Sequence, residues 1–229
     1  MKRTALGIVL AAIGALSAAA RTPAPAAAAA AASLQADAAA ALSRAAALYS
    51  DGAAHVSPFT QIYTPAGFTT ERRESGKVWI QAPQRLRFEY AAPEKTIYTY
   101  DAGEGRFFSP EDKQLTVRRL TADEKARLPI VFLSDPAELS REYAISVEAD
   151  PSAAPTRLLL KPRARGTPPA DLAWLRLSIG RDGEVRELSF EDSGGNRTEF
   201  RFEAWREEKA RPAGHFRIAG PPGTRILEN

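Results

Sequence analysis

The stretch RLRFEY, residues 85–90, decides the fold. Its apolar residues Leu86, Phe88 and Tyr90 alternate with charged residues. Successive side chains of a strand point to opposite faces, so this alternation predicts a strand with one buried face. The same pattern recurs at 171–179 and 197–205. The sequence therefore favours a curved antiparallel sheet, and what covers its apolar face becomes the functional question.

Strand-like alternation continues through most of the chain, interrupted once. The residues Gly180–Gly183 and Ser193–Asn196 accept the positive φ of tight hairpins. Between 120 and 139 the pattern changes to that of short helices, and an alanine-rich helix is expected over Leu34–Tyr49. We predict one strongly bent, mainly β sheet with helices against one side. The predicted strands are 57–64, 68–75, 77–82, 85–91, 95–101, 105–109, 114–118, 142–148, 156–161, 171–179, 184–191, 197–205 and 214–219.

The first residues have the composition of an export signal. Lys2 and Arg3 precede an apolar run from Ala5 to Leu16, which is followed by small residues. This pattern predicts a secretory signal peptide over 1–20, with a permanent anchor as the alternative. Residues 21–33 are rich in alanine and proline and are predicted to form a linker, or an extension of the following helix. Residues 34–229 are predicted to form a single domain.

Composition excludes several classes of function. The chain has no cysteine, which excludes disulfides, thiolate catalysis and cysteine-bound metals. Of its 31 basic residues, two belong to the predicted signal, which leaves 29 against 28 acidic residues. Because the two signs are interspersed and nearly balanced, we expect no nucleic-acid partner.

No catalytic constellation is visible in the sequence. The only histidines, His55 and His215, lie in no recognisable motif and are predicted to be structural. The chain contains no phosphate-binding loop, no nucleophile elbow and no dinucleotide fingerprint. We therefore expect a protein that is not an enzyme and that uses neither cofactor nor metal.

Apolar residues form the remaining signal. Aromatic residues are frequent in the first strand run, and the interruption between the two runs carries LPIVFL at 128–133. An ordinary core is one interpretation of these residues. The other is a sheet that encloses an apolar pocket, with the interruption as its lid.

Six short elements occur in an order that resembles the periplasmic lipoprotein carrier family (LolA). Each element alone is weak, whereas their order and spacing together are more specific. They are FTQ at 59–61, GKVWIQAP at 76–83, FEY at 88–90 followed by Pro93, LPIVFL at 128–133, GRDG at 180–183, and Phe216 followed by Pro221 and Pro222.

The resemblance implies an unclosed antiparallel β-barrel with an N-terminal helix and a helical lid. It implies a monomeric periplasmic carrier that holds the acyl chains of lipoproteins. Such a carrier receives them from an inner-membrane ABC transporter and delivers them to an outer-membrane receptor. Alternatives are a carrier or sensor of another lipid or acylated ligand on the same scaffold, of the envelope-stress regulator type, and, third, an enzyme. The expected acyl-binding residues are Phe59, Val78, Ile80, Leu86, Phe88 and Tyr90, and the expected lid residues are Leu128, Ile130, Val131, Phe132 and Leu133.

One position departs from the family pattern. Members commonly have an arginine before the proline that ends the strand after Gly76, where the arginine fastens the lid. This chain has Ala82 there, which leaves Arg85 and Arg87 as the nearest candidates to replace it.

Overall fold

The protein is described from a computed structural model. The structure describes residues 25–121, 139–140, 143–148, 155–163 and 172–228, with the backbone alone for 25–31. The predicted signal peptide and the predicted lid residues, from Leu128 to Leu133, lie outside these ranges, so both stay predictions. Within the described part, no helix combines the length and the apolar character needed to cross a bilayer.

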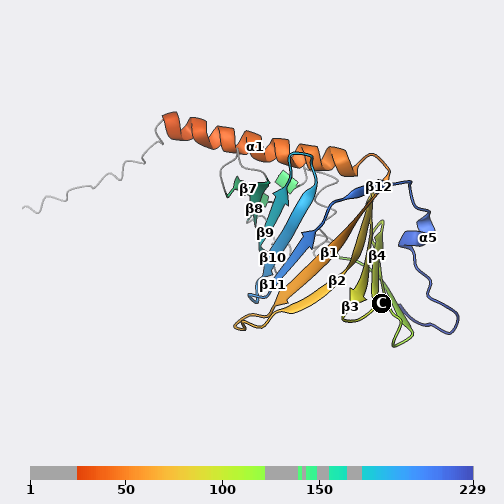
Figure 1. Ribbon diagram of the computed structural model, residues 1–229. Coiled ribbons are helices and arrows are strands. Elements are labelled where there is room, and N and C mark those ends of the chain that lie inside the picture. Colours follow the sequence, from red (N-terminus) through yellow and green to blue (C-terminus); the bar gives the residue numbers. More distant parts are fainter. Residues whose placement is uncertain (1–24, 122–138, 141–142, 149–154, 164–171, 229) are drawn as a thin grey trace, which may run out of the picture.

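Two helices and thirteen strands make up the described fold (Figure 1). The helices are α1 (Pro25–Tyr49) and α5 (Ala213–Phe216). The first strand run contains β1 (Ala54–Thr64), β2 (Arg72–Gln81), β3 (Arg85–Ala92), β4 (Ile97–Asp101), β5 (Glu104–Ser109) and β6 (Gln114–Arg119). The second contains β7 (Tyr143–Val147), β8 (Thr156–Pro162), β9 (Leu172–Ile179), β10 (Val185–Asp192), β11 (Arg197–Phe202), β12 (Arg206–Glu208) and β13 (Arg225–Glu228).

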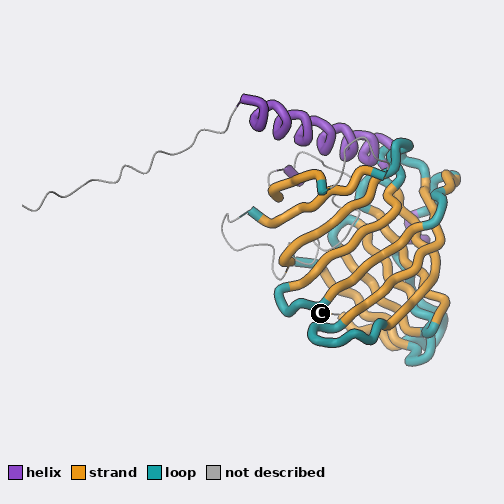
Figure 2. The backbone as a smooth tube through the Cα atoms, turned by 60° about the vertical axis from the view of Figure 1, so that its left-hand side comes forward, coloured by secondary structure: helices purple, strands orange, loops and turns teal. Residues whose placement is uncertain are grey.

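All thirteen strands belong to one curved sheet (Figure 2). Its order is β13-β6-β5-β4-β3-β2-β1-β11-β10-β9-β8-β7, with the short β12 also paired to β1. Neighbours are antiparallel except β13, which runs parallel to β6. Among the described strands, β7 and β13 end the sheet and do not pair with each other. The prediction of an unclosed, strongly curved antiparallel sheet with an N-terminal helix is confirmed.

Helix α1 packs on the second strand run through small side chains. Ala41 and Ala45 are fully buried, together with Leu42 and Tyr49, and the helix contacts β7, β8 and β9. The β9–β10 hairpin approaches so closely that a Cβ at Gly183 would lie 2.7 Å from a helix carbonyl oxygen. The helix begins at Pro25, so most of the range predicted as a linker is the helix extension that was its alternative.

Strand alternation sorts the side chains into two faces. The inner face carries the large apolar cluster, with Phe59, Phe88, Leu175 and Leu188 among its buried members. A row on the outer face crosses β2 to β5 at Trp79, Arg87, Thr99 and Arg106. Its members are side by side because the strands are in register. The inner face is therefore the main core, and the outer face is amphipathic.

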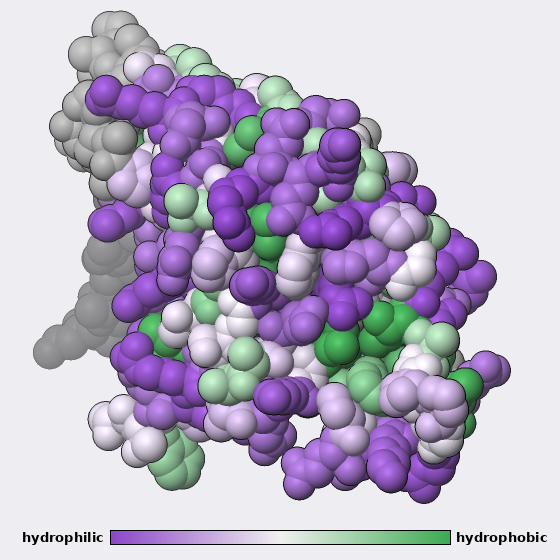
Figure 3. All heavy atoms as spheres, turned by 45° about the vertical axis from the view of Figure 1, so that its right-hand side comes forward, coloured by the Kyte–Doolittle hydropathy of each residue, from purple (hydrophilic) through white to green (hydrophobic). Residues whose placement is uncertain are grey.

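The C-terminal segment, residues 209–224, covers this outer row (Figure 1). Arg87 Nη1 donates to the His215 carbonyl oxygen at 2.9 Å, and Arg106 Nη1 donates to that of Ile218 at 2.8 Å. The Trp79 and His215 rings meet edge to face at 5.2 Å. Figure 3, turned toward the side of α5, shows a mostly hydrophilic surface whose hydrophobic side chains lie mainly in the lower right of the view, with a few single ones elsewhere. The segment thus supplies acceptors for two outer-face arginines.

Three strand predictions were wrong in detail. Residues predicted as two strands, 68–75 and 77–82, contain a single strand, β2. Gly76 does not break it but lets β3 approach, since a Cβ there would lie 2.0 Å from the Glu89 carbonyl oxygen. The predicted strand 214–219 is instead α5 and the chain that follows it, because this segment lies over a finished sheet and bonds to side chains. Strands β12 and β13 were not predicted.

Candidate functional site

An aromatic cluster on the inner face is formed by side chains of β1, β3 and β11, and those of β1 and β3 approach each other across Gly76 of β2. The Phe59 ring lies 5.0 Å from Phe88 and 5.1 Å from Tyr90, both edge to face. Phe200 completes the group, 5.4 Å from Phe88 between ring centroids. Such pairs contribute about 0.5–1.5 kcal/mol each beyond their burial. The cluster is therefore a well-packed apolar surface, built from strands distant in sequence.

The structure brings all six predicted acyl-binding residues to this one face. Val78 pairs with Phe88 across β2 and β3, and Ile80 pairs with Leu86. Five of the six are buried, and Tyr90 is half-buried. Their proximity is established, and their role in binding stays a prediction. The six are Phe59, Val78, Ile80, Leu86, Phe88 and Tyr90.

One polar pair borders the cluster. The Tyr90 hydroxyl donates a hydrogen bond of 2.6 Å to Oε1 of Gln61, which lies two residues beyond Phe59 on the same face of β1. Burial, with a smaller contribution from the Glu74 carboxylate, raises the pKa of Tyr90, so the hydroxyl stays protonated.

The inner face is closed at one end. There the Tyr49 ring of α1 meets His55 and Trp205 edge to face, and the Trp205 indole donates to the Val185 carbonyl oxygen at 2.8 Å. His55 is buried and pairs with Asp51 at 3.0 Å, in agreement with a structural role.

The opposite end of the inner face is more exposed. Along β2, Ile80 and Val78 are buried, whereas the side chain of Glu74 is 24% exposed and that of Arg72 is 67% exposed. Both charged residues lie beside the β1–β2 hairpin. The Tyr90–Gln61 pair thus lies between the aromatic cluster and these charged residues at the hairpin end.

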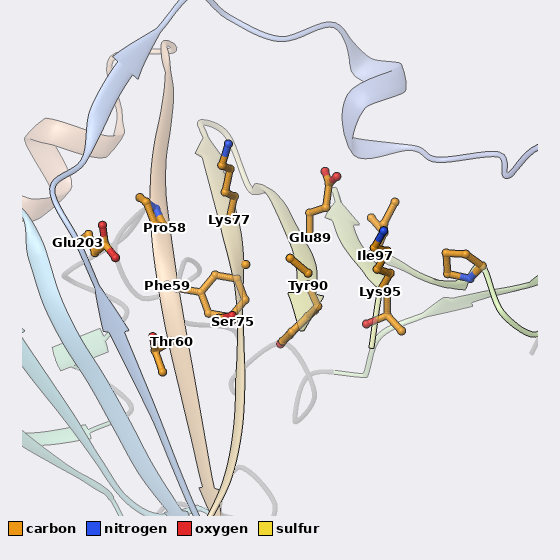
Figure 4. Close-up of a pocket in the computed structure, with 14 residues that line it drawn as sticks. Pro58, Phe59, Thr60, Ser75, Lys77, Glu89, Tyr90, Lys95, Ile97 and Glu203 are labelled. Carbon is orange, nitrogen blue, oxygen red and sulfur yellow. The ribbon is translucent and has the colours of Figure 1, made fainter. Parts of the chain in front are cut away.

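A described pocket lies on the outer face of the sheet. Its volume is about 650 Å³, and Pro58, Lys77, Glu89 and Ile97 line it as one cross-strand row on the outer face. Figure 4 shows Lys77 and Glu89 extending in the same direction while Tyr90 extends the other way. This pocket is a depression in a charged surface, whereas the inner face is filled by its own rings.

Residues 53–219 match the family described as outer membrane lipoprotein carrier protein LolA. The chain belongs to this family. The carrier family match spans β1 to the chain just after α5 and so includes every strand of the aromatic cluster.

Curated relatives carry the same family name. The outer-membrane lipoprotein carrier protein of Xanthomonas campestris pv. campestris (strain B100) is 31% identical over 169 residues, covering 74% of this chain and 79% of the relative. That of Pseudomonas entomophila is 25% identical over 171 residues, with the same coverage. An uncharacterized conserved protein from Thermus thermophilus has a similar fold, with a TM-score of 0.53 at 10% identity over 82% of this chain and 97% of that one.

Neither arginine near Ala82 points toward the inner face. Arg85 pairs with the buried Asp101 at 3.4 Å, and Arg87 holds the C-terminal segment. Both lie on the outer face by strand alternation. The described partners of both side chains thus lie on the face opposite Phe88.

Sequence analysis missed three residues of this site. Phe200 and Phe202 belong to an alternating stretch that was recognised as a strand but not assigned to the site. Gln61 is the last residue of the FTQ element, and a polar residue at an inward position of an apolar strand was the available signal. Among the described residues, no group of three or more potential metal ligands occurs.

Proposed function

We propose that the protein is a carrier that binds the acyl chains of lipoproteins against the inner face of its sheet. The observation that supports this is the continuous aromatic and aliphatic surface, closed by α1 and Trp205 at one end and exposed at the other. The names of the carrier relatives agree with it. The proposed contact residues are the six on β1, β2 and β3, together with Phe200.

The energetics suit a carrier. Burying acyl carbon contributes about 0.8 kcal/mol per methylene, so one long chain provides about 10 kcal/mol before costs. The rings of Phe59, Phe88, Tyr90 and Phe200 must separate to admit a chain, which forfeits their mutual contacts. Affinity is the difference between these terms. When the chain leaves, the rings close on one another again, which makes release less costly.

The route of the cargo is part of the same proposal. Signal residues 1–20 direct the chain to the periplasm, where it takes lipoproteins from an inner-membrane ABC transporter and passes them to an outer-membrane receptor. Residues Leu128–Leu133 cover the bound chains as a lid. The arrangement requires neither a cofactor nor an enzymatic step.

The deciding experiment identifies what the protein carries. The full chain is expressed in a Gram-negative host, recovered from the periplasm, and its co-purified lipid identified by mass spectrometry alongside N-terminal sequencing. We expect acylated lipoproteins bound to a chain that lacks Met1. Free fatty acids or phospholipids as the only ligands would favour the carrier or sensor of another acylated ligand, and an intact Met1 on membrane-bound material would favour an anchor.

A further inference from the structure

The Tyr90–Gln61 hydrogen bond lies at the boundary between two chemical environments. On one side are the rings of Phe59 and Phe88, and on the other is the exposed hairpin end with Glu74. A lipid anchor has the same division, because its hydrocarbon chains end in ester and amide carbonyl groups next to the peptide. If hydrocarbon fills the inner face, these carbonyl groups come to rest near Tyr90.

A carbonyl oxygen that leaves water needs a donor. Burying it without one is unfavourable, and polar groups in apolar sites determine selectivity for this reason. Of the three rings that contact Phe59, Tyr90 carries a hydroxyl, whereas Phe88 and Phe200 carry none. Gln61 occupies that donor while no ligand is bound.

Building on the proposed acyl-binding function, we propose that Tyr90 recognises the acyl linkage. Its hydroxyl leaves Gln61 and donates to a carbonyl oxygen of the ligand. Gln61 is half-buried and near the exposed end, so water can replace the lost donor at its Oε1. The ligand class is a neutral ester or amide of a long acyl chain, because its carbonyl oxygen adjoins the hydrocarbon and accepts the hydrogen bond that Tyr90 donates.

The test compares two ligands that differ only in the linkage. One is a synthetic lipopeptide whose two hexadecanoyl chains are joined to glycerol by esters, and the other has two hexadecyl chains joined by ethers. Each dissociation constant is measured on the full chain by displacement of a fluorescent alkyl probe. The readout is the selectivity ratio, the constant for the diether divided by that for the diester.

Tyr90→Phe removes only the hydroxyl. We expect it to lower the selectivity ratio about 3- to 10-fold, the range of one hydrogen bond, while diether affinity stays within about twofold. Unchanged diether binding also shows that the variant is folded.

Tyr63→Phe is the matched control. It removes a hydroxyl from the same face of β1, two residues beyond Gln61, and leaves the Tyr90–Gln61 bond in place. Its ratio should equal that of the wild type within about twofold. A Tyr90→Phe protein with the wild-type ratio, or with equal losses for both ligands, overturns linkage recognition alone. Failure of the wild type to bind either ligand overturns the acyl-carrier function as well.

Discussion

Two residues of the inner face, Phe59 and Leu175, are equally buried but lie in different halves of the sheet. Phe59 is 2% exposed in the aromatic cluster, and Leu175 is 0% exposed on β9. We expect Phe59→Ala to cost about 3–5 kcal/mol of unfolding free energy and Leu175→Ala about 2–5 kcal/mol. Acyl affinity should fall markedly in the first variant alone. Urea denaturation and binding of a labelled lipopeptide measure both effects, and equal affinity losses would remove Phe59 from the site.

His215 makes the C-terminal segment sensitive to acid. Burial, and to a lesser degree Arg87 and Arg211, lowers the pKa of His215 from 6.5 to about 4, against the weaker opposing effect of Glu89 and Glu208. The neutral ring is thus favoured in the folded state, and the unfolded chain binds more protons between these two pH values. The contribution of His215 to stability is therefore fully present above pH 6.5 and is lost as the pH falls toward 4.

The variant His215→Phe keeps an aromatic ring against Trp79 and cannot be protonated. We expect its melting temperature to depend less on pH between 6.5 and 5 than that of the wild type. Carboxylates with lowered pKa, such as Asp51 and Glu208, still produce acid unfolding at lower pH in both proteins. Parallel melting curves across this window would show that His215 is not the sensitive group.

At the scale of elements, the segment over the outer face depends on a few directed bonds. Arg87→Met keeps the stem of the side chain but removes the donor to the His215 carbonyl oxygen. We expect the free energy of unfolding to fall by about 1.5–3 kcal/mol, the range for charged hydrogen bonds. Amide exchange should be faster than in the wild type over 213–228 and unchanged over β9 and β10. Arg201→Met, whose side chain is 58% exposed beside Glu199, is the control and should cost at most about 1 kcal/mol.

The same elements show what sequence patterns can and cannot predict. Alternation located β3, β8 and β10 to within one residue, because the period of two is a local property. It also grouped Phe88 with Leu86 and Tyr90 on one face. It did not predict that residues 209–224 would cover Trp79, since alternation assigns a face and does not say what lies over it. The close packing of α1 against Gly183 likewise depends on contacts between segments far apart in sequence.

At the scale of the molecule, the central position of β1 determines how the two strand runs combine. β1 pairs with β2 on one side and with β11 on the other, so Phe59 faces Gly76 and Phe202 across its two ladders. The first run alone leaves one edge of β1 open. The aromatic cluster requires Phe200 from the second run. Both runs are therefore needed for the site and for the core.

This central position also has a consequence during synthesis. The ribosome makes β1 early, and Phe202 of β11 follows its partner Phe59 by 143 residues, so the centre of the sheet is completed late. Pairings of such high contact order form slowly. We expect a purified chain that ends at residue 192 to be digested rapidly by protease, and the chain that includes β11 and β13 to resist it. Until β11 pairs with β1, the chain stays incompletely folded. An unfolded chain can pass through a narrow pore, as the predicted export signal would require.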